Sequence, residues 1–336
     1  MSMPPVQAER SLADPVATTS EAPEAKIHGR SPAKIAFERL RQDKVAVAAT
    51  VIVIFFVLVA IFAPLIGDLF GVQLRAVDAT NLLDPYTTYG NVGPPNFPFT
   101  WAHPLGVQPG TGYDLLAEWL YGARTSLEVA TLSTVTTTIV GVVIGLVAGF
   151  AHGWLDRVIG FFIDVFLSFP FLLGALTLSP IITSRYASQA NLLDKAQFLS
   201  LIFVLTFFGW MPLARLVRGE VLSLREREFI QAARVIGVPT RAILFRELLP
   251  NLTAPIIVSI SLGLPAFVTA EAGFAYLGIG LTSRPSWGQT INKAYGNFEK
   301  FPLWLWAPVV GIMLLVVALN LLGDSVRDAF DPKTRR

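Results

Sequence analysis

Six long apolar stretches constrain this chain more than any other feature of its sequence. A helix of about 20 apolar residues crosses the roughly 30 Å hydrocarbon core of a bilayer, so each stretch is long enough to span a membrane. Only two stretches contain a charged residue, which is Asp164 in the third and Glu271 in the fifth. The stretches cover residues 45–66, 129–151, 158–180, 198–214, 252–281 and 301–322.

Composition supports a membrane protein and excludes several kinds of site. Of the 336 residues, 53% are hydrophobic and only 15% are charged, which is too apolar for a soluble domain of this size. The chain has no cysteine, so disulfides and thiolate metal sites are excluded. The three histidines, His28, His103 and His152, lie far apart in the sequence. We therefore expect no metal site, and we expect no nucleic-acid partner.

The distribution of positive charge predicts the orientation in the membrane. Cytoplasmic segments of membrane proteins carry an excess of Lys and Arg. With six spans and the amino terminus inside, 19 of the 26 Lys and Arg residues fall on the inner side and 7 on the outer side. We therefore predict an all-α membrane protein with six transmembrane helices and both termini in the cytoplasm.

The same pattern divides the chain into segments. Residues 1–25 almost lack large apolar residues and predict a disordered cytoplasmic tail. Residues 26–44 interleave basic and apolar residues, which indicates an amphipathic helix on the membrane surface before the first span at 45–66. Residues 67–125 predict a long outer loop, rich in Pro and aromatic residues, that either contacts a partner or covers the span ends. The remaining segments are a transmembrane domain at 126–323, with a cytoplasmic loop at 215–251, and a cytoplasmic tail at 324–336.

The stretch Glu228–Asn251 is polar and basic although it lies between two apolar spans. Ala232-Ala233 predicts a short helix that ends at Gly237, and Pro239 prevents that helix from continuing. A second helical stretch follows, and Leu249-Pro250 leads back into the membrane. The pattern predicts either a protruding helix–turn–helix that fits a partner's groove or an ordinary amphipathic loop.

Small residues recur at a helical spacing in the second apolar stretch. Gly141, Gly145, Gly149 and Gly153 follow one another at intervals of four residues. Such a repeat places the glycines near one helix face, where two backbones can approach closely. We therefore predict that all four take part in helix packing.

Asp164 and Glu271 are the only acids well inside the apolar stretches. A charge at the bilayer centre costs about 2.5–3.5 kcal/mol, so both side chains are expected to face protein or water. Either they line a translocation path or relay protons, or they form buried hydrogen bonds or ion pairs. Arg157, close to Asp164 in the sequence, favours an ion pair for that residue.

The stretch Glu228–Asn251 resembles the "EAA" loop of ABC-importer permeases, whose pattern is Glu-Ala-Ala, three residues, Gly, nine residues and Ile-x-Leu-Pro. Gln231 stands at the Glu position, and Glu247 stands at the Ile position, so both depart from the pattern. In the family this loop docks on the ATPase subunit. The resemblance implies a docking helix at Phe229–Gly237 with Arg234 as a charged contact. The implied loop comprises Glu228, Phe229, Gln231, Ala232, Ala233, Arg234, Gly237, Leu249 and Pro250.

Further segments resemble the C-type membrane subunit of dipeptide/oligopeptide ABC importers. Each is short, but their order and spacing together are specific from about residue 35 to the end. The usual acidic stretch after "HPLG" is altered at 107–111. The segments are "RLRQDKVAVAATVIVIFFVLVAIFAPLIG" at 39–67, "HPLG" at 103–106, "GYDLLAEWLYGARTSL" at 112–127, "YLGIGL" at 276–281, "PSWGQTI" at 285–291 and "NLLGDSVRDAFDPKTRR" at 320–336.

The resemblance implies a type I ABC-importer permease fold in the inner or plasma membrane of a prokaryote. The implied partners are the lipid bilayer, a homologous second permease, an outer substrate-binding protein, and one or two cytoplasmic ATPase subunits that carry ATP and Mg. The chain itself is expected to bind no cofactor and not to be an enzyme, since it has no GxxxxGK[ST] phosphate loop. The implied substrates are peptides.

Three other functions remain open from the sequence. An ion-coupled secondary transporter would use Asp164 or Glu271. An intramembrane enzyme would need a nucleophile and base or metal ligands, and the apolar stretches contain neither His nor Cys. A membrane scaffold would tolerate loss of the loop Gln231–Gly237, whereas a permease would not.

Overall fold

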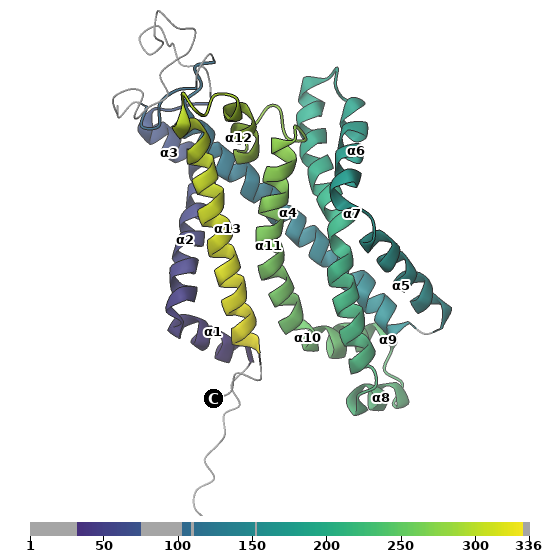
Figure 1. Cartoon of the computed structure of the whole chain (residues 1–336). Helices are drawn as coiled ribbons and strands as arrows, with labels where there is room; N and C mark the ends of the chain where they lie inside the picture. The colour runs from purple at the N-terminus through teal and green to yellow at the C-terminus, as the bar shows by residue number, and fades with distance from the viewer. Residues whose placement is uncertain (1–31, 75–102, 109–110, 152, 332–336) are drawn as a thin grey trace, which may run out of the picture.

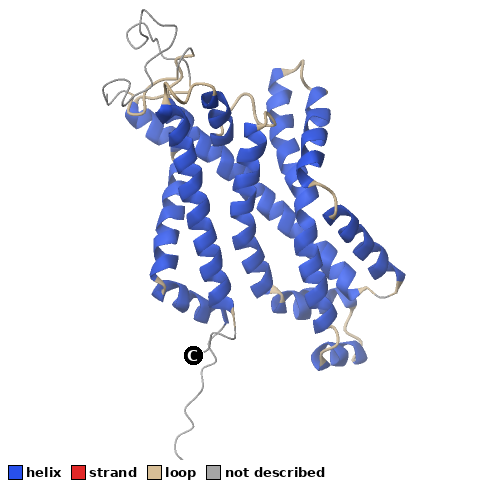
Figure 2. Cartoon of the chain, in the orientation of Figure 1, coloured by secondary structure: helices blue, strands red, loops and turns tan. Residues whose placement is uncertain are grey.

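The computed structural model describes residues 32–74, 103–108, 111–151 and 153–331. Over these ranges the secondary structure is helical, apart from one isolated bridge between Val107 and Asp114 (Figure 2). Predictions for the amino-terminal tail and for most of the long outer loop fall on residues outside these ranges. The helices are α1 (Pro32–Gln42), α2 (Lys44–Ile61), α3 (Ala63–Phe70), α4 (Leu115–Phe150), α5 (Trp154–Leu167), α6 (Phe171–Ser184), α7 (Ala190–Leu224), α8 (Glu228–Val235), α9 (Thr240–Ala242), the π-helix η2 (Ile243–Leu248), α10 (Leu249–Asn251), α11 (Thr253–Tyr276), α12 (Trp287–Tyr295) and α13 (Pro302–Phe330).

The predicted all-α class is confirmed over the described residues, which hold five candidate spanning helices, or six spans if a bent pair of helices is counted as one. Five helices are long and apolar enough to cross a membrane, namely α2, α4, α7, α11 and α13. The helices α5 and α6 pass the same test as a pair, but they are bent by 89° at the break between them. The apolar stretch 158–180 is therefore two helices rather than one straight helix. Pro170 explains the break, because proline cannot donate a helical hydrogen bond and its ring disfavours helical geometry at Phe169.

The second spanning helix begins earlier than predicted. Asp114 accepts hydrogen bonds from the backbone N–H groups of Leu116 at 2.8 Å and Ala117 at 3.0 Å, which caps α4 at Leu115. The last residues assigned to the outer loop at 67–125 are therefore helical. His103 Nδ1 lies 2.5 Å from the same carboxylate, so the segment before α4 is attached to its start.

Figure 1 shows how the helices are arranged. The helices α2 and α13 run side by side, and α4 crosses the bundle diagonally. The helix α11 lies between α13 and α7 in this view. The short helices α3 and α12 lie at one end of the bundle, and α1 and α8 lie at the other (Figure 1). At that end α1 is beside the end of α13, and α8 is below α7.

The helix α1 is attached to the end of α13. Arg39 donates to the carbonyl oxygen of Ala329 at 3.1 Å, and the Ser325 hydroxyl donates to Asp43 at 3.0 Å. The backbone N–H of Val45 and the Ser325 hydroxyl both lower the pKa of Asp43, because they stabilise its charged form.

A close seam joins α4 to α7. A Cβ added at Gly145 would lie 2.6 Å from the Val217 Cβ, and one at Gly149 would lie 2.6 Å from the Val221 Cβ. At Gly141 the nearest atoms, on Leu213 and Trp210, would be 3.0 Å away. These three glycines therefore let the two backbones approach one another.

Gly153 does not share this seam, which corrects the prediction that all four glycines pack together. The helix α4 ends at Phe150, and Gly153 precedes α5 with a φ of 72° and no neighbour within 4 Å among the described residues. Its role in this fold is the left-handed turn between α4 and α5.

Candidate docking surface and translocation groove

The helix α8 ends at a left-handed glycine turn. It runs from Glu228 to Val235, and Gly237 follows with a φ of 82°. The N–H of Gly237 donates to the Arg234 carbonyl and the N–H of Val238 donates to the Ala233 carbonyl, so the last turn of the helix is closed. The predicted helix stop at Gly237 is confirmed, because only glycine adopts this backbone conformation without steric cost.

One face of this loop is buried against the transmembrane helices. Ile230 and Leu248 are fully buried, and Ala233 and Ile243 are nearly so. They pack in one cluster with residues of α4 and α7, including Val221. These buried side chains therefore determine which face of the loop packs against α4 and α7.

The opposite face of the loop exposes apolar side chains. Val235 is 87% exposed and Ile236 is 78% exposed, at the end of α8 next to the glycine turn. Phe229 and Phe245 are also exposed. An exposed apolar group at the tip of a protruding helix is typical of a protein-binding surface.

Polar contacts hold α8 to the end of α4. Arg225 Nη1 donates to the carbonyl oxygens of Gly149 and Ala151, each at 3.1 Å. Gln231 Nε2 donates to the Arg225 carbonyl at 3.1 Å. The guanidinium of Arg234 lies 4.7 Å from the centre of the Phe150 ring, which is a cation–π distance. Arg234, predicted as a contact for the partner, therefore faces α4 in this structure.

The remaining residues of the predicted loop lie on α8 and α10. Glu228 and Ala232 are exposed on α8, and Pro250 is exposed in α10. Leu249 is half-buried and packs against the cluster beneath the loop. Arg225 is not among the predicted loop residues, because its bonds to α4 join residues that are far apart in the chain.

Two ion pairs attach α5 to α7. Asp156 Oδ1 accepts from Arg218 Nε at 2.6 Å, and Asp164 pairs with Arg215. Asp164 is 63% exposed and does not lie inside a continuous span. An ion pair was one of the two predictions for Asp164, but its partner is Arg215 rather than the neighbouring Arg157.

Glu271 is fully buried in α11. The hydroxyls of Ser126 and Ser286 face its carboxyl group, but neither carboxyl oxygen has a hydrogen-bond partner among the described residues. Glu271 of α11 therefore faces α4 and the start of α12. It does not line the groove between α4, α6, α7 and α11.

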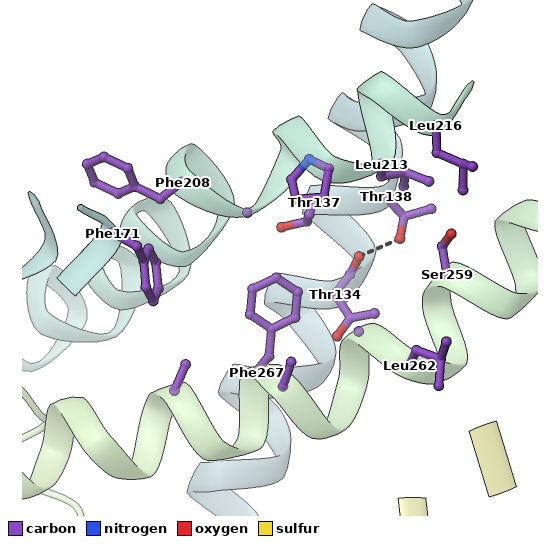
Figure 3. A pocket seen from close by; sticks show the side chains of 15 residues that line it. Thr134, Thr137, Thr138, Phe171, Phe208, Leu213, Leu216, Ser259, Leu262 and Phe267 are labelled. Carbon is purple, nitrogen blue, oxygen red and sulfur yellow. Dashed lines mark hydrogen bonds between the residues drawn. The ribbon is translucent and has the colours of Figure 1, made fainter. Parts of the chain in front are cut away.

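A groove of about 500 Å³ lies between α4, α6, α7 and α11 (Figure 3). Three threonines of α4 line one side, and each of the other three helices contributes one phenylalanine together with other, mostly small or apolar, residues. Thr134 and Thr138 donate to backbone carbonyls of their own helix, whereas the buried Thr137 hydroxyl has no partner among the described residues. Among the described residues, no charged side chain lines the groove. Its lining comprises Thr134, Thr137, Thr138, Phe171, Phe208, Gly209, Pro212, Leu213, Leu216, Ser259, Leu262, Gly263, Ala266, Phe267 and Ala270.

Comparison with known proteins identifies the family of this chain. Residues 141–336 match the family of binding-protein-dependent transport system inner membrane components. Residues 31–85 match the N-terminal transmembrane domain of oligopeptide transport permease C.

Three curated relatives support the same family. The chain is 32% identical to the dipeptide transport system permease protein DppC of Alkalihalophilus pseudofirmus, over 94% of this chain and 95% of the relative. It is 33% identical to the glutathione transport system permease protein GsiD of Escherichia coli, over 91% and 92% respectively. It is 34% identical to the oligopeptide transport system permease protein OppC of Mycobacterium bovis, over 69% and 77%.

These matches decide between the functions left open by the sequence. The family is a non-enzymatic membrane component of ABC importers, so the alternative of an ion-coupled secondary transporter using Asp164 and Glu271 is wrong. The chain belongs to the family of binding-protein-dependent transport system inner membrane components, and it is a multi-pass permease subunit of a prokaryotic ABC importer.

Proposed function

We propose that this chain forms half of the path of a peptide importer and is driven through the exposed tip of α8. The observation that carries the proposal is the two-sided loop at 228–251. One side is fixed to α4 and α7 by Ile230, Leu248 and Arg225, and the other side exposes Val235 and Ile236. A force applied to the exposed side would therefore move α4 and α7 directly.

The proposed partner at this surface is a cytoplasmic ATPase subunit, which would carry ATP and Mg. The exposed apolar tip fits an apolar groove on such a partner. The excess of Lys and Arg at this end supports a cytoplasmic location for the loop, and with it both termini. A second, homologous permease would complete the path, and an outer binding protein would deliver the substrate.

Peptides are the proposed substrates. The support is that the relatives are named for dipeptide, glutathione and oligopeptide transport. The groove is compatible with peptides of differing charge, because the described residues of its walls are apolar or hydroxyl-bearing and none is charged. In this proposal the chain passes peptides through without selecting among them, and the binding protein determines which peptide is captured.

The test uses a substitution that does not disturb the fold. Val235→Asp with Ile236→Asp puts two charges on the exposed tip, where neither side chain is packed. We expect the variant to remain in the membrane with the second permease and to lose the ATPase subunits in a mild-detergent pull-down, together with ATP-driven uptake.

A matched control makes the same kind of change at the opposite end of the bundle. Leu69 of α3 is 81% exposed, and Leu69→Asp is expected to leave capture of the ATPase unchanged. Gly237→Asp is a second variant of the loop, since it strains the left-handed turn, and it should also abolish uptake. Normal uptake by both loop variants would refute the docking role.

A further inference from the structure

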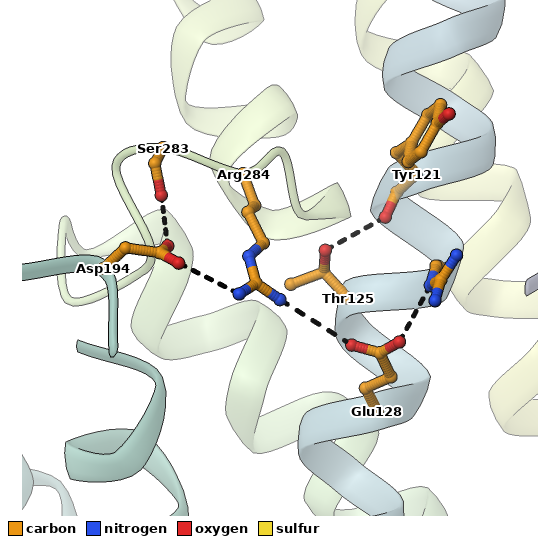
Figure 4. Close-up of polar contacts among 7 residues, drawn as sticks. Tyr121, Thr125, Glu128, Asp194, Ser283 and Arg284 are labelled. Atoms are coloured by element: carbon orange, nitrogen blue, oxygen red, sulfur yellow. Dashed lines mark hydrogen bonds and ion pairs between the residues drawn. The ribbon is translucent and has the colours of Figure 1, made fainter. Parts of the chain in front are cut away.

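A cluster of charged and polar side chains joins three elements at the end of the bundle opposite α8 (Figure 4). The segment between α11 and α12 supplies Ser283 and Arg284. The first turns of α7 supply Asp194, and α4 supplies Arg124 and Glu128. None of these residues lines the groove or belongs to the docking surface.

Three consecutive residues of the segment bind one face of α7. Both the backbone N–H and the hydroxyl of Thr282 donate to Gln197 Oε1, at 3.0 and 3.1 Å. Ser283 donates to one oxygen of Asp194, and Arg284 Nη2 donates to the other at 2.9 Å. Asp194 and Gln197 lie one turn apart on the helix, so they form a single binding edge.

Arg284 extends the same contact to α4. Its Nη1 atom lies 4.0 Å from Glu128 Oε2, and Glu128 accepts a second bond from Arg124 at 2.8 Å. The guanidinium also lies 5.5 Å from the centre of the Phe198 ring on α7. Arg284 therefore contacts both α7 and α4. Leu281 of the same segment is buried in an apolar cluster with Val129 of α4 and with Leu201 and Leu205 of α7.

The seam on the other side of α12 is of a different kind. Trp287 is fully buried and donates to the Trp119 carbonyl of α4 at 3.0 Å. A Cβ added at Gly288 would lie 2.1 Å from the Ala272 carbonyl oxygen, so α12 and α11 are in backbone contact. This seam is apolar and closely packed, and it cannot open without exposing a large tryptophan.

The seam on α7 has a polar, partly exposed rim beside the buried apolar side chain of Leu281. The side chain of Arg284 is 44% exposed, that of Glu128 is 37% exposed and that of Asp194 is 21% exposed. Partly exposed ion pairs are individually weak, because water competes for both partners. If α7 and α11 separate at this end, the polar rim parts together with the contacts of Leu281 on α7, and α12 stays with α11.

Both α7 and α11 line the groove, so their separation at this end would open the groove there. We propose that Arg284 and Asp194 are positioning residues of the transport cycle, which hold the α11–α12 segment on α7 while this end is closed and release it when this end opens. The inference rests on the proposed function, because it needs a cycle driven by ATP.

The first test locks the seam covalently. The chain contains no cysteine, so Gln197→Cys with Thr282→Cys introduces the only two thiols in this subunit. A short bifunctional methanethiosulfonate joins them, and a reductant separates them again. The readout is ATP hydrolysis by the reconstituted complex in the presence of the loaded binding protein, because this needs no prior assignment of the pore.

We expect cross-linking to abolish stimulated ATP hydrolysis and reduction to restore it. The single variants, treated with the same reagent, are expected to remain active. A cross-linked complex that hydrolyses ATP at the full stimulated rate would overturn the proposal.

The second test weakens the seam instead. Arg284→Gln and Asp194→Asn each remove a contact that holds the seam closed, so each is expected to raise ATP hydrolysis without the binding protein by roughly two- to fivefold. Lys195→Gln removes a charge from the adjacent residue, which is exposed, and is expected to leave this rate unchanged. Unchanged rates for both seam variants would also count against the proposal.

Failure of the proposed function gives a different result. If the unaltered chain captures no ATPase subunit and shows no ATP-driven uptake, the proposed function is refuted before any seam variant is measured. If the unaltered complex is active and the locked complex is equally active, only the role of Arg284 and Asp194 is refuted.

Discussion

Replacing Gly145 with alanine measures how closely α4 and α7 must approach one another. The new Cβ would lie 2.6 Å from the Val217 Cβ and 2.8 Å from the Ala214 carbonyl oxygen. Carbon atoms in contact are normally about 3.5–4.0 Å apart, so about 1 Å must be recovered by separating the helices or by moving Val217. The carbonyl oxygen belongs to the backbone of α7 and cannot move alone.

Two opposing contributions determine how much Gly145→Ala changes the free energy of unfolding. Overpacking of this kind costs about 1–3 kcal/mol. The change from glycine to alanine in a helix returns about 1 kcal/mol, because the unfolded chain loses conformational freedom. Gly219 lies on the exposed side of α7, and an added Cβ there would have no neighbour within 4 Å among the described residues. Gly219→Ala therefore gains the helix propensity of alanine without any overpacking. The free energies of unfolding of Gly145→Ala and Gly219→Ala should therefore differ by about 1–3 kcal/mol, with Gly145→Ala the less stable.

The assay is the loss of monodisperse protein after heating the detergent-solubilised complex. A difference of 1 kcal/mol corresponds to about 2–4 °C in Tm for a medium-sized domain, so Gly145→Ala should melt several degrees below Gly219→Ala. Gly149→Ala should resemble Gly145→Ala, and Gly141→Ala should be milder because its nearest contacts are 3.0 Å away. Equal melting temperatures for Gly145→Ala and Gly219→Ala would refute the close seam.

Three further predictions follow from contacts elsewhere in the fold. Asp114→Ala should lower stability by about 1 kcal/mol or more through loss of the α4 cap, whereas Asp114→Asn should keep most of it; thermal melting of the pair decides this. Arg225→Ala removes both bonds to the end of α4, so the loop at 228–251 should be cleaved faster by limited proteolysis while Arg227→Ala, with no such bonds, is cleaved as before. Glu271→Gln keeps the shape of the side chain and removes its charge, so uptake should be retained; a folded, inactive Gln variant would show that the carboxylate takes part in transport.

Features that depend on a few neighbouring residues were predictable from the sequence. The apolar stretches predict the number of spanning segments, because crossing a hydrocarbon layer depends on length and polarity alone. The helix stop at Gly237 was predictable because the left-handed turn and Pro239 are local. The glycine repeat predicted a packing face at Gly141, Gly145 and Gly149 but overran the end of the helix at Gly153.

Features that depend on distant residues were not. The apolar pattern at 158–180 is the same for a straight helix and for two helices joined at 89°, although Pro170 marks where the break occurs. The start of α4 was missed because its first turns, at 115–128, contain charged residues that interrupt the apolar pattern. The seam at Arg284 joins residues far apart in the chain, and no local pattern indicates it.

Asp164 and Glu271 are alike in sequence, since each is a lone acid in an apolar stretch, but one is exposed and the other is buried in the fold. Asp164 lies on the short helix α5, is largely exposed, and is neutralised by Arg215 of α7. Glu271 is enclosed by three helices and faces only hydroxyl groups among the contacts described. An exposed ion pair contributes little, so Asp164 can be replaced at small cost, whereas a change of shape at Glu271 must be absorbed by α4, α11 and α12 together. The packing of α12 on α11 and α4 next to Glu271 also holds the base of the segment that carries Arg284, and in the proposed cycle it is the fixed side of the contact with α7.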